Sequence, residues 1–343
     1  MTADLWDLYV LMYKSRIFEE AVRTAWKKGL ISGEMHLGMG EEAICAGIIS
    51  QLVEGDAMAL DHRGTPPMIM RGVSPAGLML EFMGKPGGLS GGQGGHMHLF
   101  DPGRLIASSG IVGAAGPAAV GFALSGQVLR TGSAAIAFFG DGASNAGMLM
   151  ESLNLAVLWK LPVIFVCKDN DWAISTPKES AVAGSLLDRA RGFGMPAFEV
   201  NGADVLAVQE SAHSALKIAR SGAGPVFLLA HCVHLEGHFL GDGLLDMVRR
   251  PVYSFRKRIW PMTKGFFRTG GALLNERVQS MKQILGYVAR HTSQTDISQD
   301  PVNRARIQLL SMNRERLIEL ETGIRRQLQE QLDQAMAESG GQL

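Results

Sequence analysis

The sequence of 343 residues has little cysteine and no excess of charge of either sign. Its three cysteines, Cys45, Cys167 and Cys232, are widely spaced and odd in number, which argues against a disulfide framework and favours a reducing compartment. Lys and Arg together number 33, as do Asp and Glu, so no overall field favours nucleic acid or a membrane surface as a partner. Asp4 and Asp7 stand where a secretory leader would need basic and then apolar residues. We therefore expect a cytoplasmic protein.

Long runs of strongly apolar residues are also scarce. The stretch from Leu105 to Leu129 has no charged residue and is long enough to span a bilayer. It is built largely from Gly, Ala and Ser and contains Pro117, so its hydrophobicity is low. We expect no transmembrane segment here, but a buried helix whose small side chains let it pack closely under a sheet or against another subunit.

The most informative stretch runs from Gly140 to Trp172. An unbroken apolar run of strand length, Ala134–Phe139, leads into the turn Gly140-Asp141-Gly142. Apolar residues at helical spacing follow between positions 148 and 159, and a second apolar run extends from Val163 to Cys167. A strand, a crossover helix and a second strand of these lengths predict a right-handed βαβ unit with parallel strands.

Two polar residues follow the two strands of this unit. Asp141 and Asn170 both emerge at the carboxyl edge of the sheet, where such sheets bind ligands. A carboxylate and an amide oxygen suit Mg²⁺ that still carries phosphate oxygens. The helix start after Gly142, with Ser144 or Asn145 as its cap, would offer backbone N–H groups to those phosphates. Because an Asp in a tight turn is by itself more often turn chemistry than a ligand, the metal prediction depends on the whole set of residues.

That set resembles the fingerprint of thiamine diphosphate enzymes. The GDG turn is followed by Asn145-Ala146-Gly147, by Glu151 and Asn154 on the helix, and by a strand that ends in Asn170. The variant ESLNLAVLWKLPVIFVC narrows the resemblance to the alpha subunit of the first component of 2-oxoacid dehydrogenase complexes, which include pyruvate, branched-chain 2-oxoacid and acetoin dehydrogenases. It covers about Leu5 to Asp242. The resemblance implies an α/β thiamine diphosphate-binding fold, with a mostly parallel sheet, helices on both faces, an N-terminal helix and a C-terminal helical tail.

The resemblance also implies a set of site residues. Asp141, Asn170 and the main-chain carbonyl of Trp172 would hold Mg²⁺ on the diphosphate of the cofactor. His36 would face the substrate pocket, and His238 would assist acyl transfer, so these two histidines are the candidate catalytic residues. The candidate cofactor-binding residues are His62, Arg63, Gly110, Val112, Asp141, Gly142, Ala143, Asn170, Trp172 and His238.

Several positions around this site depart from the family pattern. The departures are His62 for Tyr, Thr65-Pro66 for His-Gly, Ala115 for Gln, Lys168 for Glu, and His234 for Arg. Asp141, Asn170 and Arg63 remain, so we expect metal and diphosphate binding to survive. Specificity for pyruvate does not follow from the sequence.

Two further motifs allow other interpretations. The segment Gly84–Phe100 is glycine-rich and fits neither a Walker loop nor a dinucleotide fingerprint, so composition alone indicates a flexible linker. The family has a similar run as an ordered loop near the cofactor and partner subunit, in which His96 and His98 would be structural. Zinc has to be considered for the cluster His231, Cys232, His234 and His238. Without a second Cys pair, we favour the family loop, here Gly237 to Asp242.

The chain divides on these grounds into four segments. They are an N-terminal helix and arm (1–35), the α/β domain (36–243), a divergent basic arm and loop (244–303), and a C-terminal helix (304–343). Within them, 289–303 is expected to be a loop and 308–339 one long helix. The segment 247–268 is basic and aromatic, which is compatible with a membrane or nucleic-acid surface, but we favour an arm that covers a partner subunit.

The sequence has the diphosphate half of a thiamine enzyme and no second half. In the family, the Glu that activates the cofactor lies on the beta subunit, so the expected unit has two alpha and two beta chains, with the acyl group passing to a lipoyl acyltransferase core. We favour a working 2-oxoacid or acetoin dehydrogenase alpha subunit that uses thiamine diphosphate and Mg²⁺. Two alternatives remain open: a subunit of a non-oxidative decarboxylase or carboligase, and a non-catalytic paralogue that binds a partner.

Overall fold

The computed structural model describes residues 3–174, 176–241, 270–271, 273–291 and 297–338. Its centre is a seven-stranded sheet in the order β2-β3-β1-β4-β5-β9-β8, in which every pair except β2 with β3 is parallel. A separate antiparallel pair, β6 with β7, follows β5. The strands are β1 (Ala57–Leu60), β2 (Phe100–Asp101), β3 (Ile106–Ser108), β4 (Ala135–Gly140), β5 (Val163–Asp169), β6 (Trp172–Ala173), β7 (Thr176–Pro177), β8 (Ala197–Asn201) and β9 (Val226–His231).

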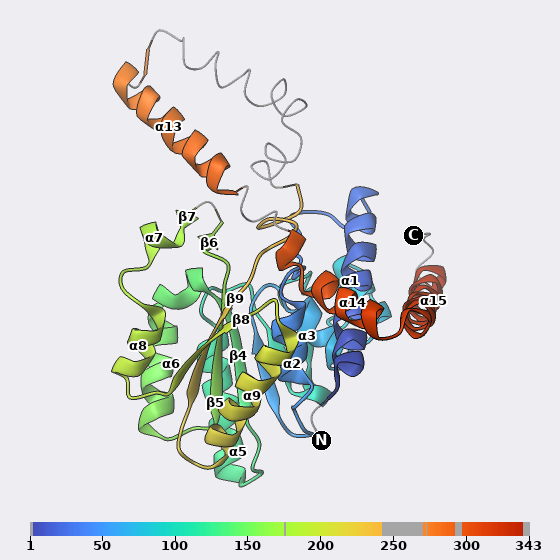
Figure 1. The fold of residues 1–343 in the computed structure, drawn as a ribbon, viewed down its shortest axis with the longest axis horizontal. Coiled ribbons are helices and arrows are strands. Elements are labelled where there is room, and N and C mark those ends of the chain that lie inside the picture. Colours follow the sequence, from blue (N-terminus) through green and yellow to red (C-terminus); the bar gives the residue numbers. More distant parts are fainter. Residues whose placement is uncertain (1–2, 175, 242–269, 272, 292–296, 339–343) are drawn as a thin grey trace.

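Helices cover both faces of this sheet (Figure 1). The 3₁₀ turns are η1 (Pro102–Arg104), η2 (Asp141–Asn145) and η5 (Ile297–Gln299). The α-helices are α1 (Leu5–Lys27), α2 (Glu42–Ile49), α3 (Thr65–Met70), α4 (Pro75–Phe82), α5 (Ala115–Leu129), α6 (Gly147–Leu158), α7 (Lys178–Ala181), α8 (Leu186–Gly192), α9 (Val205–Arg220), α13 (Leu274–His291), α14 (Pro301–Met312) and α15 (Arg314–Glu338). The predicted α/β class, with helices on both faces of a mostly parallel sheet, is confirmed.

The unbroken apolar strands are explained by burial on both sides. Along β4, Ile136 and Phe138 face one core with α1, α2 and α9, while Ala137 and Phe139 face a second core with α5, α6 and α8. Strands β4 and β5 pair in parallel from Ala135 with Val163 onwards, as the βαβ pattern predicted. Central parallel strands need apolar side chains on both faces for this reason.

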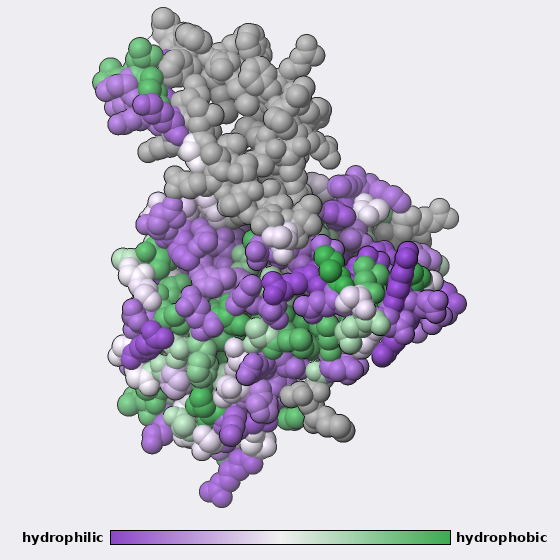
Figure 2. All heavy atoms as spheres, in the orientation of Figure 1, coloured by the Kyte–Doolittle hydropathy of each residue, from purple (hydrophilic) through white to green (hydrophobic). Residues whose placement is uncertain are grey.

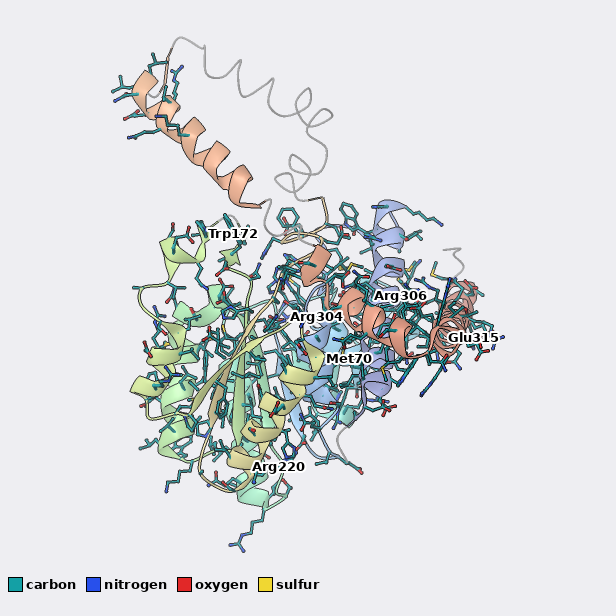
Figure 3. All side chains as sticks on the ribbon, in the orientation of Figure 1. Met70, Trp172, Arg220, Arg304, Arg306 and Glu315 are labelled. Carbon is teal, nitrogen blue, oxygen red and sulfur yellow. The ribbon has the colours of Figure 1, made fainter. Side chains whose placement is uncertain are left out.

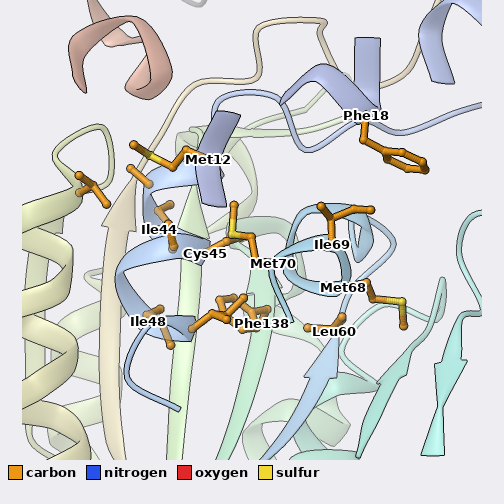
Figure 4. Close-up of a cluster of buried hydrophobic side chains, with 14 of the residues drawn as sticks. Met12, Phe18, Ile44, Cys45, Ile48, Leu60, Met68, Ile69, Met70 and Phe138 are labelled. Carbon is orange, nitrogen blue, oxygen red and sulfur yellow. The ribbon is translucent and has the colours of Figure 1, made fainter. Parts of the chain in front are cut away.

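The larger core contains several flexible methionine side chains among its aliphatic and aromatic residues. Figure 4 shows Met12 of α1, Ile44 of α2 and Met70 of α3 meeting above Phe138 of β4. Methionine adapts to irregular gaps between helices that cross at different angles. The N-terminal helix α1 is therefore part of the same core as the sheet, although the sequence division assigned it to a separate segment.

The C-terminal helices pack on α1 and differ from the prediction. The expected single helix from 308 to 339 is wrong, because α14 ends at Met312 and α15 begins at Arg314. Between them, Asn313 is extended, with φ −158° and ψ 100°. The expected loop 289–303 is also wrong at both ends, since α13 continues to His291 and α14 begins at Pro301, capped by the Asp300 side chain.

Hydrogen bonds at Leu240 and Asp300 join the two flanks of residues 241–299, here called the divergent segment, to the body of the protein. Arg16 of α1 donates to both carboxylate oxygens of Asp300, each at 2.9 Å, and to Glu42 at 2.6 Å. On the other side, the Leu240 amide donates to the Met35 carbonyl at 2.8 Å. The basic stretch 247–268 lies outside the described residues, and α13 lies apart from the sheet (Figure 1).

The uncharged stretch 105–129 is only partly buried, which corrects the expectation of a buried helix. Within it α5 packs Ala119 and Ala123 under the sheet but exposes Leu124, Val128 and Leu129. Figure 2 shows apolar surface in the lower left of the view, on the side of α5 and α6. Among the described helices, none combines the length and the apolar character that crossing a membrane requires.

Candidate functional site

One pocket lies at the carboxyl edge of the sheet, where β1, β4 and β5 end. Its volume is about 290 Å³. Figure 3 shows Trp172 at this edge and Arg220 at the opposite edge of the sheet. Every site residue that the resemblance implied lines the pocket: His36, His62, Arg63, Gly110, Val112, Asp141, Gly142, Ala143, Asn170, Trp172 and His238. The structure thus brings the whole set together, while the role of each residue stays a prediction.

The turn after β4 is tighter than the sequence indicated. Asp141 opens a short 3₁₀ turn, η2, and the α-helix begins only at Gly147, with Ala146 at its cap position and no side-chain cap. The expected cap by Ser144 or Asn145 is therefore wrong, because Asn145 instead donates to the Ala181 carbonyl. Gly142 is required here, since a Cβ atom at this position would lie 2.7 Å from Cβ of Ala173.

Oxygen atoms of the three predicted metal ligands converge in this pocket. One side of the Asn170 amide faces His234 Nδ1 at 3.0 Å. The other side lies 3.0 Å from the Trp172 carbonyl oxygen and 3.2 Å from Asp141 Oδ1. With the amide oxygen on that second side, three acceptor oxygens face one another. That arrangement is repulsive by itself and is the one that a hard cation such as Mg²⁺ requires.

The surroundings of Asp141 suit a bound cation. Burial, with the negative charge of Asp169 nearby, raises the pKa of Asp141 to about 7. Its Oδ2 atom is buried and has no hydrogen-bond partner among the described residues. A buried carboxylate oxygen without a partner is costly, and a divalent cation would satisfy it.

A buried arginine lies on the other side of the pocket. Arg63 is 1 % exposed, and its guanidinium donates to the main-chain carbonyls of Leu37 and His238, the latter at 2.7 Å. Its Nε lies 3.9 Å from a Glu41 oxygen. These contacts hold the planar group in one orientation, which is the geometry that suits phosphate oxygens.

Three imidazoles surround Arg63. His36, His62 and His238 each offer a ring nitrogen within 4.8 Å of the others. Burial, assisted by the charge of Arg63, lowers the pKa of His36 to about 2 and that of His238 to about 3, and it lowers the pKa of His62 in the same way. Such a set could ligate a transition metal. The field that keeps the rings neutral also repels a dication, so the cluster better suits an anion, to which a neutral ring donates its N–H.

The zinc set raised by the sequence does not assemble as one group. Among the described residues the possible metal-ligand groups are His36–His62–His238 and Glu41–Cys232–His234. His231 instead lies 2.7 Å from Glu199. In the second group, Lys168 Nζ already lies 2.6 Å from Glu41, so a cationic group occupies the position beside the carboxylate.

We expect acid to destabilise the cofactor-free chain below about pH 6.5, the ordinary pKa of histidine. Folded rings that stay neutral bind fewer protons than unfolded rings, so stability falls as pH falls, by at most about 1.4 kcal/mol per pH unit for each ring. Five buried or half-buried rings have lowered pKa values, and three carboxyls with raised pKa values act in the opposite sense. The rings are His36, His62, His96, His234 and His238, and the carboxyls are Glu19, Asp61 and Asp141.

The measurement is the thermal midpoint between about pH 5.5 and about pH 7.5, where the histidines titrate when unfolded. His62→Tyr restores the family residue and removes one of these rings. Its stability should fall less steeply with acid than that of the wild type. The number of protons taken up on unfolding should be smaller by up to one. Parallel slopes for the two proteins would contradict the assignment of a neutral, buried His62.

The glycine-rich loop is ordered by one buried carboxylate, so the linker interpretation is wrong. Glu81 of α4 accepts hydrogen bonds from the amides of Ser90, Gly92 and Gly94 at 2.7, 2.9 and 2.6 Å. The loop then places His96 Nε2 2.9 Å from His36 Nδ1. A carboxyl group three residues before the loop thereby determines how one side of the pocket is built.

Glu81→Gln is expected to loosen this loop. The amide group of Gln would place N–H donors against backbone N–H donors, and each lost hydrogen bond to a charged acceptor costs about 1.5–3 kcal/mol. We expect lower stability and faster amide hydrogen exchange at 84–99, with little change in the sheet. Glu54→Gln, at an exposed position, is the matched control. Unchanged exchange in the loop would show that Glu81 does not anchor it.

Lys168 stands where the family has Glu, and buried carboxylates balance its positive charge. It is 1 % exposed and donates to Glu41 at 2.6 Å and Asp61 at 3.0 Å. Although burial opposes ionisation, Lys168 lowers the pKa of Glu41 to about 2. Sequence reasoning missed Glu41, Asp61 and Glu81. A lysine at the end of the apolar strand VIFVCK was a signal that carboxylates had to lie nearby.

Apolar side chains surround the mouth of the pocket. Ile111, Val112 and Ile174 line the pocket and are 60 %, 62 % and 58 % exposed, and Met148 nearby on α6 is 40 % exposed. Exposed apolar groups that gather around a pocket are typical of an interaction surface.

Comparison with known proteins decides the family. The family described as "Dehydrogenase E1 component" matches residues 10–257. The chain belongs to this family. It is 43 % identical over 254 residues to the alpha subunit of the acetoin:2,6-dichlorophenolindophenol oxidoreductase of Cupriavidus necator, covering 71 % of this chain and 76 % of that protein. It is 40 % identical over 240 residues to the corresponding Bacillus subtilis subunit, covering 69 % of this chain and 72 % of that protein.

A pyruvate dehydrogenase E1 component alpha subunit is also similar. The protein of Zymomonas mobilis is 37 % identical over 262 residues, covering 76 % of this chain and 74 % of that protein. The family assignment confirms the resemblance drawn from the sequence, and it makes this chain an oxidoreductase of the E1 alpha type. The dehydrogenase E1 match ends at residue 257, before α13, α14 and α15.

Proposed function

We propose that this chain binds the diphosphate of thiamine diphosphate through Mg²⁺ and serves a 2-oxoacid or acetoin dehydrogenase as its alpha subunit. The observation that carries the proposal is the convergence of oxygens from Asp141, Asn170 and Trp172 across one pocket from the guanidinium of Arg63. The first group suits a hard cation and the second suits phosphate. A magnesium-bound diphosphate contains both a hard cation and phosphate oxygens.

The residues of the chain would then have distinct tasks. Asp141, Asn170 and the Trp172 carbonyl would hold Mg²⁺, while Arg63 and His62 would bind phosphate oxygens. Gly110 and Val112 would lie along the aminopyrimidine ring. When bound, thiamine diphosphate supplies the carbanion that adds to a 2-oxo group and the ring that accepts the electrons left by decarboxylation. His36 and His238 line the same pocket and would face the substrate and the acyl acceptor.

The site as described lacks one chemical group, which supports a partner. The carboxylates that line the pocket are Glu41, Asp61 and Asp141. Lys168 pairs with the first two, and the metal would occupy the third. Among the described lining residues, none is left to activate the aminopyrimidine ring. We propose that a beta subunit supplies this carboxyl group and covers the apolar mouth, in a unit of two alpha and two beta chains in the cytoplasm.

Acyl transfer to a lipoyl group of an acyltransferase core is the proposed second half-reaction. We expect His238→Ala to slow overall turnover at least about tenfold, the low end for removing a general acid or base. Reduction of a dye by the decarboxylation half-reaction should change less. The substitution leaves the main-chain carbonyl of His238, and hence its bond to Arg63, in place. An equal loss in both assays would count against a role of His238 in transfer.

Native mass spectrometry of the chain purified from its own cells with Mg²⁺ tests the proposed function. A mass of two copies of this chain, two of a partner and bound thiamine diphosphate would support it. A cofactor-free homo-oligomer that persists with added cofactor and a coexpressed beta chain would favour the non-catalytic alternative. Bound cofactor without any transfer to a lipoyl domain would favour a non-oxidative decarboxylase or carboligase.

A further inference from the structure

Behind the proposed metal site lies a chain of four buried polar side chains. Lys168 Nζ donates to Glu41 Oε2 at 2.6 Å, and the other oxygen of Glu41 lies 2.8 Å from His234 Nε2. His234 Nδ1 in turn lies 3.0 Å from the Asn170 amide. All four residues are 7 % exposed or less. The chain therefore runs through the protein interior and ends on a proposed metal ligand.

The direction of hydrogen bonding along this chain follows from its charged end. Lys168 can only donate, so Glu41 beside it accepts, and a carboxylate has no hydrogen to give back. His234 must then carry its hydrogen on Nε2, facing Glu41, which leaves the lone pair of Nδ1 facing Asn170. Only the Nδ2 group of Asn170 can donate to that lone pair. The amide oxygen is thereby turned toward Asp141 and the Trp172 carbonyl.

We infer that the chain Lys168–Glu41–His234 is a positioning device that holds the Asn170 amide with its oxygen toward the metal. The inference rests on the proposed metal site and adds residues that do not contact the metal in that proposal. Lys168 and His234 are two of the positions at which this sequence departs from the family.

The alternative orientation of Asn170 shows why such a device is useful. Turned by 180°, its Nδ2 group donates to the Trp172 carbonyl at 3.0 Å and to Asp141 Oδ1 at 3.2 Å. These hydrogen bonds would occupy the oxygens that the cation needs. In that orientation the amide oxygen would need a donor at His234 Nδ1, and the Glu41 carboxylate prevents this by taking the ring hydrogen on the opposite side.

A double-mutant cycle tests the inference. Binding of Mn²⁺ to the full chain in complex with its beta subunit, with thiamine diphosphate present, is measured by electron paramagnetic resonance of the free ion. His234→Phe should weaken Mn²⁺ binding about 10- to 100-fold, as loss of groups that orient metal ligands does. The same change in an Asn170→Asp background should cost less than about threefold, because a carboxylate presents an oxygen in either orientation. Equal losses in both backgrounds would mean that His234 only supports the structure and would overturn the inference.

Replacement of Lys168 gives a second test, because positioning and electrostatics predict opposite changes in Mn²⁺ affinity. Lys168→Met removes a positive charge near the site, so electrostatics alone predicts tighter Mn²⁺ binding. Positioning predicts weaker binding. Lys178→Met is the matched control, since Lys178 is also a cation beside this loop, paired with Asp169 and Asp171, but it is outside the chain. Weaker binding in Lys168→Met with unchanged or tighter binding in Lys178→Met supports the inference.

The outcomes separate this inference from the proposed function. A wild-type complex with the beta subunit that binds no Mn²⁺ with the cofactor present would overturn both. A wild-type chain that binds Mn²⁺, together with a His234→Phe chain that binds it equally well, would overturn the positioning role alone. Should Lys168→Met fail to fold because it leaves Glu41 unpaired, the cycle between positions 234 and 170 still decides.

Discussion

Asp141→Ala is expected to abolish binding of the metal and, with it, of thiamine diphosphate. The carboxylate is buried, its Oδ2 has no hydrogen-bond partner in the described structure, and its other oxygen meets two further oxygens. Loss of groups behind a metal ligand already weakens binding about 10- to 100-fold, so loss of a charged ligand should exceed a hundredfold. Calorimetric titration with thiamine diphosphate and Mg²⁺ measures the effect. The fold should survive, because the substitution removes an unsatisfied buried charge.

Asp171→Asn is the matched control for Asp141. It removes one negative charge from the same loop, but its side chain is 65 % exposed and pairs with Lys178. Asparagine also tolerates the positive φ of 63° at this position. We expect less than about a threefold change in affinity, since an exposed charge is screened. Comparable losses for the two variants would mean that the site responds to net charge, and the assignment of Asp141 as a ligand would fail.

Arg63→Lys is expected to weaken binding of thiamine diphosphate at least about tenfold, even though the charge is kept. A lysine cannot bridge the Leu37 and His238 carbonyls and present a planar fork to phosphate at the same time. Arg63→Met should lose binding and stability, because two buried carbonyls also lose their donor. Fluorescence titration with the cofactor at fixed Mg²⁺, together with thermal unfolding, separates the two effects.

Arg220→Met controls for the loss of a partly buried arginine. Arg220 pairs with Asp56 at 2.6 Å at the opposite edge of the sheet (Figure 3). It should reduce stability and leave cofactor affinity unchanged. If Arg63→Lys were as tight a binder as the wild type, phosphate recognition would have to lie elsewhere in the pocket.

Much of the fold followed from local patterns, and most of the candidate site followed from the resemblance to the family. The strand β5 begins at Val163, as its apolar run predicted, although it continues to Asp169 and does not end at Cys167. Asp141 and Asn170 were found because the βαβ unit brings strand ends to one edge. What the sequence missed depends on contacts between distant residues. The Lys168–Glu41 pair spans 127 positions, and Glu81 caps a loop through its backbone. Neither contact leaves a periodic pattern.

The errors in the C-terminal part have a similar cause. Leu309 and Leu317 are both buried, so their spacing reads as one continuous helix. The break between the helices at the extended residue Asn313 lets α14 pack beside α2 and lets α15 pack on α4. A single straight helix would not allow both contacts. The break depends on the surface of α2 and α4 against which the two helices pack. The local sequence of the helices does not reveal that surface.

The two contacts that flank the divergent segment have a consequence for how this protein can change. The Leu240–Met35 and Asp300–Arg16 hydrogen bonds fasten both ends of residues 241–299 to one rigid body. Chain inserted between two fastened points can vary in length and composition at little cost to its host. This is therefore the place where a lineage could acquire a new attachment without rebuilding the pocket, and where an engineer could exchange one module for another.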